Sequence, residues 1–203
     1  MRYLMTHSLL YAWIYAMKEN PFEDATSERD PMGEFMQVLR REPTETNEAM
    51  RNGIDFENLV TDIIHNCGDR SDKWWDAAVK VADEIRDSQL QFRASSVITV
   101  DGIELVLYGR LDALKAGTVY DIKFSKSYDR GKYFGSTQHP VYLKIVPEAT
   151  KFVYIVSNGT EVWHETYRRE ETEDIVPIIR DFFSWLQAND LFELYKEKWQ
   201  AAA

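Results

Sequence analysis

The sequence between residues 92 and 124 passes through three short segments rich in Val, Ile, Tyr and Phe. The segments cover residues 92–100, 103–111 and 118–124, and the turns between them contain Asp101-Gly102 and Ala116-Gly117. Strand-forming segments joined by compact, Gly-containing turns are typical of β-hairpins, because tight hairpin turns need positive φ angles. We therefore expect a three-stranded antiparallel meander, which restricts the chain to folds built around a sheet.

Helical patterns lie on both sides of this meander. Ser8 is the expected N-cap of a first helix, which Asn20-Pro21 should end. Apolar residues recur at helical spacing from Phe56 to Ile64 and again through residues 171–200, where we expect one C-terminal helix.

A second strand pair, residues 151–157 and 161–168, surrounds the turn Asn158-Gly159. The order of helices, three strands, helix, two strands and helix predicts an α/β fold in one domain. We expect residues 1–203 to divide into an N-terminal helical extension (1–52), a core (53–168) and a C-terminal helix (171–200).

The overall charge limits the function classes open to the chain. There are 34 Asp and Glu residues against 24 Lys and Arg residues, which gives a formal net charge of −10. This sign argues against broad electrostatic coating of nucleic acid or membrane. The ten uncharged residues from Ser8 to Met17 are too few to span a bilayer, and a lone Cys67 cannot form an internal disulfide. We expect a cytoplasmic protein with no membrane partner.

Two of the predicted strands carry acidic residues that could share one site. Asp112 ends the second strand of the meander, and Asp121 lies in the third strand, two residues before Lys123. Residues two apart in a strand project from the same face. Carboxylates suit a hard divalent cation, and a neighbouring ammonium group can stabilise charge on a phosphate. The alternative is an exposed Asp-Lys ion pair on a solvated strand face.

Residues from two flanking helices could complete this site. Glu57 lies beside apolar residues in the helix before the sheet, and Gln138 and Tyr142 lie at i and i+4 in the helix after it. Each also has an ordinary explanation. Glu57 could be an acidic residue favoured by the helix dipole, Gln138 a capping residue and Tyr142 a core tyrosine.

Taken together and in this order, the motifs resemble the PD-(D/E)XK nuclease superfamily, most closely its RecB-like and phage-type exonuclease branch. The resemblance covers residues 53 to 157 and rests on four matches, namely Gly53/Phe56/Glu57, Gly109/Asp112, Asp121/Lys123 and Gln138/Tyr142. It implies a restriction-endonuclease-like core, in which a mixed central sheet is flanked by helices.

The resemblance also implies the roles of individual residues. One or two Mg²⁺ or Mn²⁺ ions would be bound by Glu57, Asp112, Asp121 and the backbone carbonyl of Ile122. Lys123 would orient the attacking water and stabilise the transition state. Gln138 and Tyr142 would either contact the nucleic-acid strand or hold the motif in place.

The sequence departs from the family pattern in two places. Leu111 stands where the proline that names the superfamily is found, although RecB-like members often lack that proline. A lone Cys67 excludes the iron-sulfur cluster that some relatives bind through four cysteines. His7, His65 and His139 are not expected in the site, since surface or core positions account for them.

Positive charge gathers near the expected site despite the acidic total. Residues 115–151 hold seven Lys and Arg residues against three Asp and Glu residues, a local net charge of +4. In the loop 125–136, Lys126, Arg130 and Lys132 could bind phosphates, while an ordinary flexible basic loop is the alternative.

These features predict a metal-dependent deoxyribonuclease with DNA as its partner, most specifically an exonuclease of the phage recombination or repair type. An endonuclease with the same site is one alternative. A nuclease-like module that binds nucleic acid without cutting it is another. A recombination partner protein and a homo-oligomer both stay open, because some relatives of this branch form rings.

Overall fold

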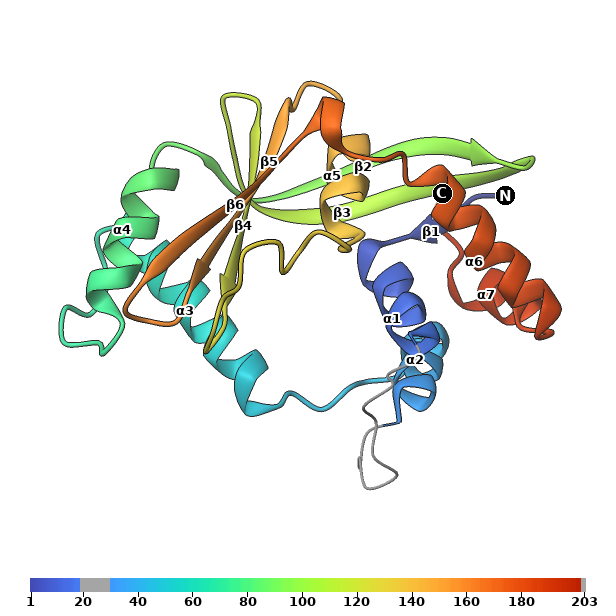
Figure 1. Ribbon diagram of the computed structural model, residues 1–203, viewed down its shortest axis with the longest axis horizontal. Coiled ribbons are helices and arrows are strands. Elements are labelled where there is room, and N and C mark those ends of the chain that lie inside the picture. The colour runs from blue at the N-terminus through green and yellow to red at the C-terminus, as the bar shows by residue number, and fades with distance from the viewer. Residues whose placement is uncertain (19–29, 202–203) are drawn as a thin grey trace.

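The computed structural model describes residues 1–18 and 30–201, and these residues form a mixed α/β fold (Figure 1). A six-stranded sheet lies between two groups of helices. In chain order the elements are β1 (Tyr3–Met5), α1 (His7–Met17), α2 (Pro31–Arg40), α3 (Glu48–Ile64), α4 (Trp75–Ile85), β2 (Gln89–Val100), β3 (Ile103–Lys115), β4 (Thr118–Phe124), α5 (Gln138–Ile145), β5 (Lys151–Ser157), β6 (Val162–Arg168), a 3₁₀ turn (Arg169–Glu171), α6 (Val176–Ala188) and α7 (Phe192–Lys198).

The expected meander is confirmed. β2 and β3 are antiparallel along almost their whole length, and β3 and β4 are antiparallel over a shorter stretch. β4 then pairs in parallel with β5, and β5 pairs antiparallel with β6. The sheet is therefore mixed, and the connection from β4 to β5 carries α5, as a parallel crossover requires.

One edge of β3 is shared by two strands that do not meet. β2 occupies the other edge of β3, while β1 pairs in parallel with Leu105–Leu107 and β4 pairs with Ala113–Lys115. β4 remains paired with β5 as far as Phe124, although its pairing with β3 ends at Tyr120. The sheet therefore opens beside residues 108–112, between the end of β1 and the second half of β4.

Apolar side chains form one buried cluster on each face of the sheet. Phe152, Tyr154 and Val156 of β5 pack toward the cluster that includes α1, α5 and α6. Val153 and Ile155, which alternate with them, pack toward α3 and α4. A strand buried on both faces in this way fixes the position of its neighbour β4.

The ends of several elements differ from the expected ones. Thr6, not Ser8, caps α1, because its hydroxyl accepts a hydrogen bond from the backbone N–H of Leu9 at 3.3 Å. The expected C-terminal helix is two helices, because Asp190 adopts a left-handed conformation with φ of 57° that ends α6. Asn20 and Pro21 lie outside the described residues.

The N-terminal segment also differs from a purely helical extension. Tyr3–Met5 is a strand of the central sheet, and α3 begins at Glu48, where the side chain of Asn47 accepts a hydrogen bond from the N–H of Met50 at 2.9 Å. Residues 1–52 therefore supply part of the sheet that supports the opening.

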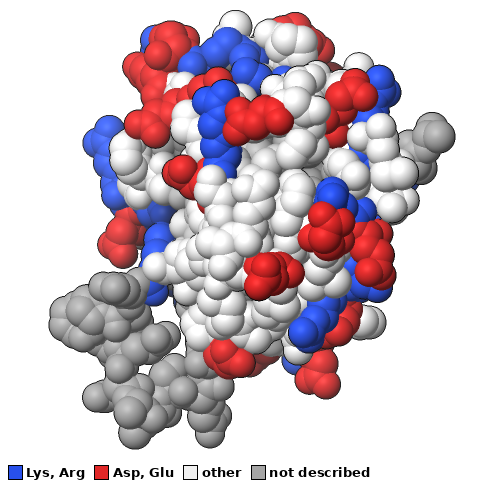
Figure 2. All heavy atoms as spheres, turned by 90° about the vertical axis from the view of Figure 1, so that its right-hand side faces the viewer, with Lys and Arg blue, Asp and Glu red and all other residues white. Residues whose placement is uncertain are grey.

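The charges on one side of the molecule are mixed. Figure 2 shows an uncharged central area bordered by acidic and basic side chains in alternation, on the side where α6 and α7 lie. A concentrated positive surface is therefore not a property of this face.

In the ranges 1–18 and 30–201, no helix is long and apolar enough to cross a membrane.

Candidate functional site

The opening in the sheet places Asp112 next to the backbone of β4. Since β4 has left β3 at this level, the N–H of Ile122 has no strand partner on that side. The carboxylate of Asp112 accepts this hydrogen bond instead, at 2.8 Å. Asp112 is only 9% exposed, so the bond fixes a buried carboxylate at the floor of the opening.

Asp121 lies in the adjacent strand and is held by two polar neighbours. Its Oδ1 atom accepts a hydrogen bond from the side-chain amide of Gln138 in α5. Its Oδ2 atom lies 2.6 Å from the Nζ atom of Lys123, which confirms that the two side chains share a face of β4. Asp121 is 3% exposed, so this ion pair is shielded from water on the carboxylate side.

Glu57 approaches the opening from α3. Its Oε1 atom accepts a hydrogen bond from the side chain of Gln91 and lies 4.0 Å from a guanidinium nitrogen of Arg110. Gln91 has a φ of 49° and lies in β2 between two residues that pair with β3. This unusual backbone conformation accompanies the contact that orients Glu57.

Tyr142 of α5 lies against β3 where Gly109 leaves room for it. The hydroxyl of Tyr142 donates a hydrogen bond to the carbonyl of Arg110 at 3.1 Å, and the ring meets His7 edge-on at a centroid distance of 5.5 Å. The carbonyl of His7 accepts a hydrogen bond from the hydroxyl of Thr137 at 3.0 Å. The N-termini of α1 and α5 are thus held together above the opening.

All seven residues predicted around the carboxylates line one cleft of about 350 Å³. They are Glu57, Asp112, Asp121, Ile122, Lys123, Gln138 and Tyr142. Residues as far apart in the sequence as Glu57 and Tyr142 therefore line one surface, where α3, β3, β4 and α5 meet.

Electrostatics in the cleft are dominated by buried acids. Burial raises the pKa of Asp112 well above its ordinary value, and repulsion by Asp121 and Glu57 raises it further. The hydrogen bond from the N–H of Ile122 lowers this pKa, but by less. Burial lowers the pKa of Lys123, but attraction to Asp121 outweighs burial and leaves that pKa raised. Lys123 is therefore an ammonium ion at neutral pH, beside carboxylates that lack a full complement of positive charge.

This donor set suits a hard divalent cation. Buried carboxylates that repel one another are stabilised when a cation lies between them. The Oδ2 atom of Asp121 is buried, and its charged neighbour is the Nζ atom of Lys123 at 2.6 Å. In the described part of the chain, no three His, Cys, Asp or Glu side chains are grouped closely enough to hold a metal ion. A cation at Asp121 would compete with Lys123 for the Oδ2 atom.

The basic loop 125–136 contributes less to the cleft than expected. Lys132 lines a cavity next to the cleft, together with Lys123 and Gln138. Arg130 lines a different cavity, with Tyr128 and Glu165. Lys126 is exposed, and it lines neither the cleft nor the cavity that contains Lys132. Of the three predicted phosphate contacts, only Lys132 lies beside the site.

The reason lies in a buried acid of β6. Glu165 accepts hydrogen bonds from the hydroxyls of Tyr128 and Tyr167 and from the backbone N–H groups of Gly131 and Tyr133. The loop is therefore wound around Glu165 and is held in one shape. No signal in the sequence marks Glu165 as the anchor, because three of its partners, Tyr128, Gly131 and Tyr133, come from a loop more than 30 residues earlier in the chain.

Sequence analysis did not place His7 or Gln91 in the site. His7 lines the cleft and has its pKa lowered to about 3, chiefly by burial and then by Lys123, so its ring is neutral. Gln91 holds Glu57. The sequence predicted the helix cap at Ser8 and the strand from residue 92, so neither the Thr6 cap beside His7 nor the place of Gln91 in β2 was expected.

Comparisons with known proteins bear on the fold alone. No family model matches the chain, and no curated protein matches it. The chain is similar to a solved structure described as the crystal structure of SSO0001, with a TM-score of 0.50 and 16% sequence identity. The match covers 92% of this chain and 76% of that chain. The mixed α/β fold, with its multistranded sheet flanked by helices, is therefore one that a solved protein shares.

Proposed function

We propose that this chain is a Mg²⁺-dependent deoxyribonuclease that hydrolyses phosphodiester bonds, acting as an exonuclease of the phage recombination or repair type. One observation carries the proposal. Glu57, Asp112, Asp121 and Lys123 come from three separate elements and line a single cleft where the sheet opens. Three carboxylates that could hold a divalent cation, beside one ammonium group, suit the metal-assisted hydrolysis of a phosphodiester.

The fold supports the same assignment. We infer a restriction-endonuclease-like core from the order of the elements along the chain. After α3 and α4 come the antiparallel strands β2 to β4, then α5 and then β5. This order, with the motif residues on the expected elements, favours the RecB-like branch of the PD-(D/E)XK superfamily.

The metal would be held by Glu57, Asp112, Asp121 and the backbone carbonyl of Ile122. When bound, Mg²⁺ or Mn²⁺ supplies a Lewis acid that polarises the phosphate and acidifies a water molecule. Lys123 supplies positive charge where the phosphate oxygens become more negative in the transition state. Gln138 restrains Asp121 through its amide, and Tyr142 fixes the cleft wall through the carbonyl of Arg110.

A catalytically silent nucleic-acid-binding module is the second candidate. It is favoured by the ion pair between Lys123 and Asp121, at 2.6 Å, which occupies a carboxylate that the metal needs. An endonuclease would use the same cleft, and only the path of the DNA would differ.

The test compares a linear duplex with the same DNA as a closed circle, each with purified protein and Mg²⁺ or Mn²⁺. An exonuclease degrades the linear form and spares the circle. Cleavage of both forms supports the endonuclease, and cleavage of neither form nor of single strands supports the silent module. Metal-dependent thermal stabilisation, measured in parallel, separates a silent module that still binds metal from one that does not.

A further inference from the structure

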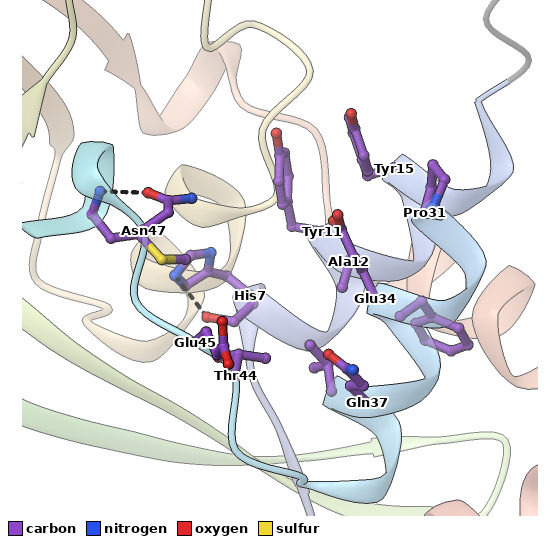
Figure 3. A pocket seen from close by; sticks show the side chains of 14 residues that line it. His7, Tyr11, Ala12, Tyr15, Pro31, Glu34, Gln37, Thr44, Glu45 and Asn47 are labelled. Atoms are coloured by element: carbon purple, nitrogen blue, oxygen red, sulfur yellow. Dashed lines mark hydrogen bonds between the residues drawn. The ribbon is translucent and has the colours of Figure 1, made fainter. Parts of the chain in front are cut away.

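Two tyrosines lie on α1, of which Tyr11 lines a cavity next to the cleft and Tyr15 lines a cavity between α1 and α2. Tyr11 and Tyr15 are one helical turn apart, with ring centroids 6.3 Å from each other and planes 20° from parallel. Their side chains point to the same side of α1 (Figure 3). Tyr11 is 49% exposed, so much of an aromatic ring is open to a ligand. Such a ring is a surface on which an unpaired base can stack.

Basic side chains border this aromatic surface. Tyr11 lines a cavity of about 350 Å³ whose wall also contains Lys18, Lys123 and Lys132. On its other side, Tyr11 lines a cavity of about 460 Å³ between α1 and α2 that includes Glu34 and Glu45. A polyanionic backbone is attracted to the lysine side and repelled from the acidic side, which gives the ligand a defined track.

This track leads to the carboxylates. His7 lines the cleft, the basic cavity and the cavity between α1 and α2, so the three spaces meet at one residue. Lys123 belongs both to the basic cavity and to the cleft. A flexible chain that lies on Tyr11 therefore passes from Lys18 and Lys132 to Asp121 over a short, continuous surface.

We propose that the exposed face of α1, with Lys18 and Lys132, binds single-stranded DNA and leads it into the cleft. The inference rests on the proposed function and adds its substrate class. Unpaired bases offer their faces to tyrosine, whereas the bases of a duplex are covered by their neighbours.

The proposal is tested by fluorescence anisotropy with a labelled oligothymidylate and with a blunt duplex, in EDTA so that cleavage is prevented. Tyr11→Ala weakens binding of the single strand about fivefold or more, since one stacked base contributes at least ~1 kcal/mol. Tyr11→Phe keeps the ring and stays within about twofold of wild type. Equal affinity of Tyr11→Ala and wild type for the single strand overturns the proposal, as does an absence of single-strand binding by wild type.

Salt dependence provides an independent arm. Lys18→Gln lowers the slope of log affinity against log salt concentration by about 0.7, the value for one phosphate contact on a single strand. Lys80 of α4 is an exposed lysine away from the track, and Lys80→Gln is the matched control with an unchanged slope. An unchanged slope in both variants contradicts the track.

Different results would exclude the single-strand track and the nuclease activity. If wild type cleaves DNA with Mg²⁺ while Tyr11→Ala cleaves and binds single strands equally well, the track is wrong and the nuclease stands. If wild type cleaves nothing but Tyr11→Ala selectively loses single-strand binding, the track stands and the nuclease is wrong.

Discussion

The two motif glycines provide a sharp test of the site geometry, because they have opposite surroundings. A Cβ atom added to Gly109 would lie 2.5 Å from Cε1, 3.0 Å from Cζ and 3.1 Å from Cδ1 of Tyr142. The closest contact is roughly 0.9 Å shorter than the 3.4 Å at which ordinary contact begins. Tyr142 is 4% exposed, hydrogen-bonded to Arg110 and packed against His7, so its ring has little room to move.

We therefore expect Gly109→Ala to lower the free energy of unfolding by about 1–3 kcal/mol, the usual cost of overpacking a core. Gly53 in α3 has no atom within 4 Å of an added Cβ. Gly53→Ala should raise the free energy of unfolding by about 0.5–1 kcal/mol, because alanine loses less backbone entropy in a helix.

Urea unfolding followed by tryptophan fluorescence measures both changes in the same assay. With an m value of about 2 kcal/mol/M, a loss of 2 kcal/mol shifts the midpoint down by about 1 M. The reasoning is refuted if Gly109→Ala unfolds at the same urea concentration as wild type or a higher one. A Gly53→Ala variant that is destabilised would show that the helix at Glu57 has another constraint.

Three further outcomes follow from the buried polar groups. Without metal, folded Asp112 holds its proton more tightly than the unfolded chain, so stability falls as pH rises from about 4 through the raised pKa. Asp112→Asn removes that fall and loses Mg²⁺-dependent thermal stabilisation, as urea titrations across pH and thermal shifts with Mg²⁺ will show. Glu165→Gln weakens the anchor of the loop 125–136, and we expect faster hydrogen exchange at Gly131 and Tyr133 with the sheet unaffected. Lys123→Ala keeps the circular dichroism spectrum of wild type and reduces cleavage at least about 10²-fold; wild-type rates in that variant would exclude its proposed role.

Much of the fold could be predicted from local patterns. The turns at Gly102 and Gly117, with φ of 81° and 72°, gave the meander because each requires a residue that tolerates positive φ. Alternation along β5 and the helical spacing in α3 have the same local origin. β1 was not predicted because a strand of three residues is too short to show a repeating pattern. It also forms only by pairing with β3, where Tyr3 lies opposite Leu105.

The site was predicted as far as its residues lie on regular elements. Asp121 and Lys123 share a face because strands alternate, and Gln138 and Tyr142 share one because helices repeat. The places of Lys126 and Arg130 were not predictable, since the loop takes its shape from Glu165 in β6. His7 lines the cleft and Gln91 contacts Glu57 through tertiary contacts that no local pattern indicates.

The most direct test of the central claim is the release of nucleotides from end-labelled linear DNA, measured with and without Mg²⁺ for wild type and Asp121→Asn. Asp121 is the buried carboxylate that both Lys123 and Gln138 contact, so its loss removes charge from the cleft without removing the side-chain shape. We expect release by wild type with Mg²⁺, and none above background in EDTA or in Asp121→Asn. Release that persists in EDTA, or that is equal in Asp121→Asn and wild type, would contradict it.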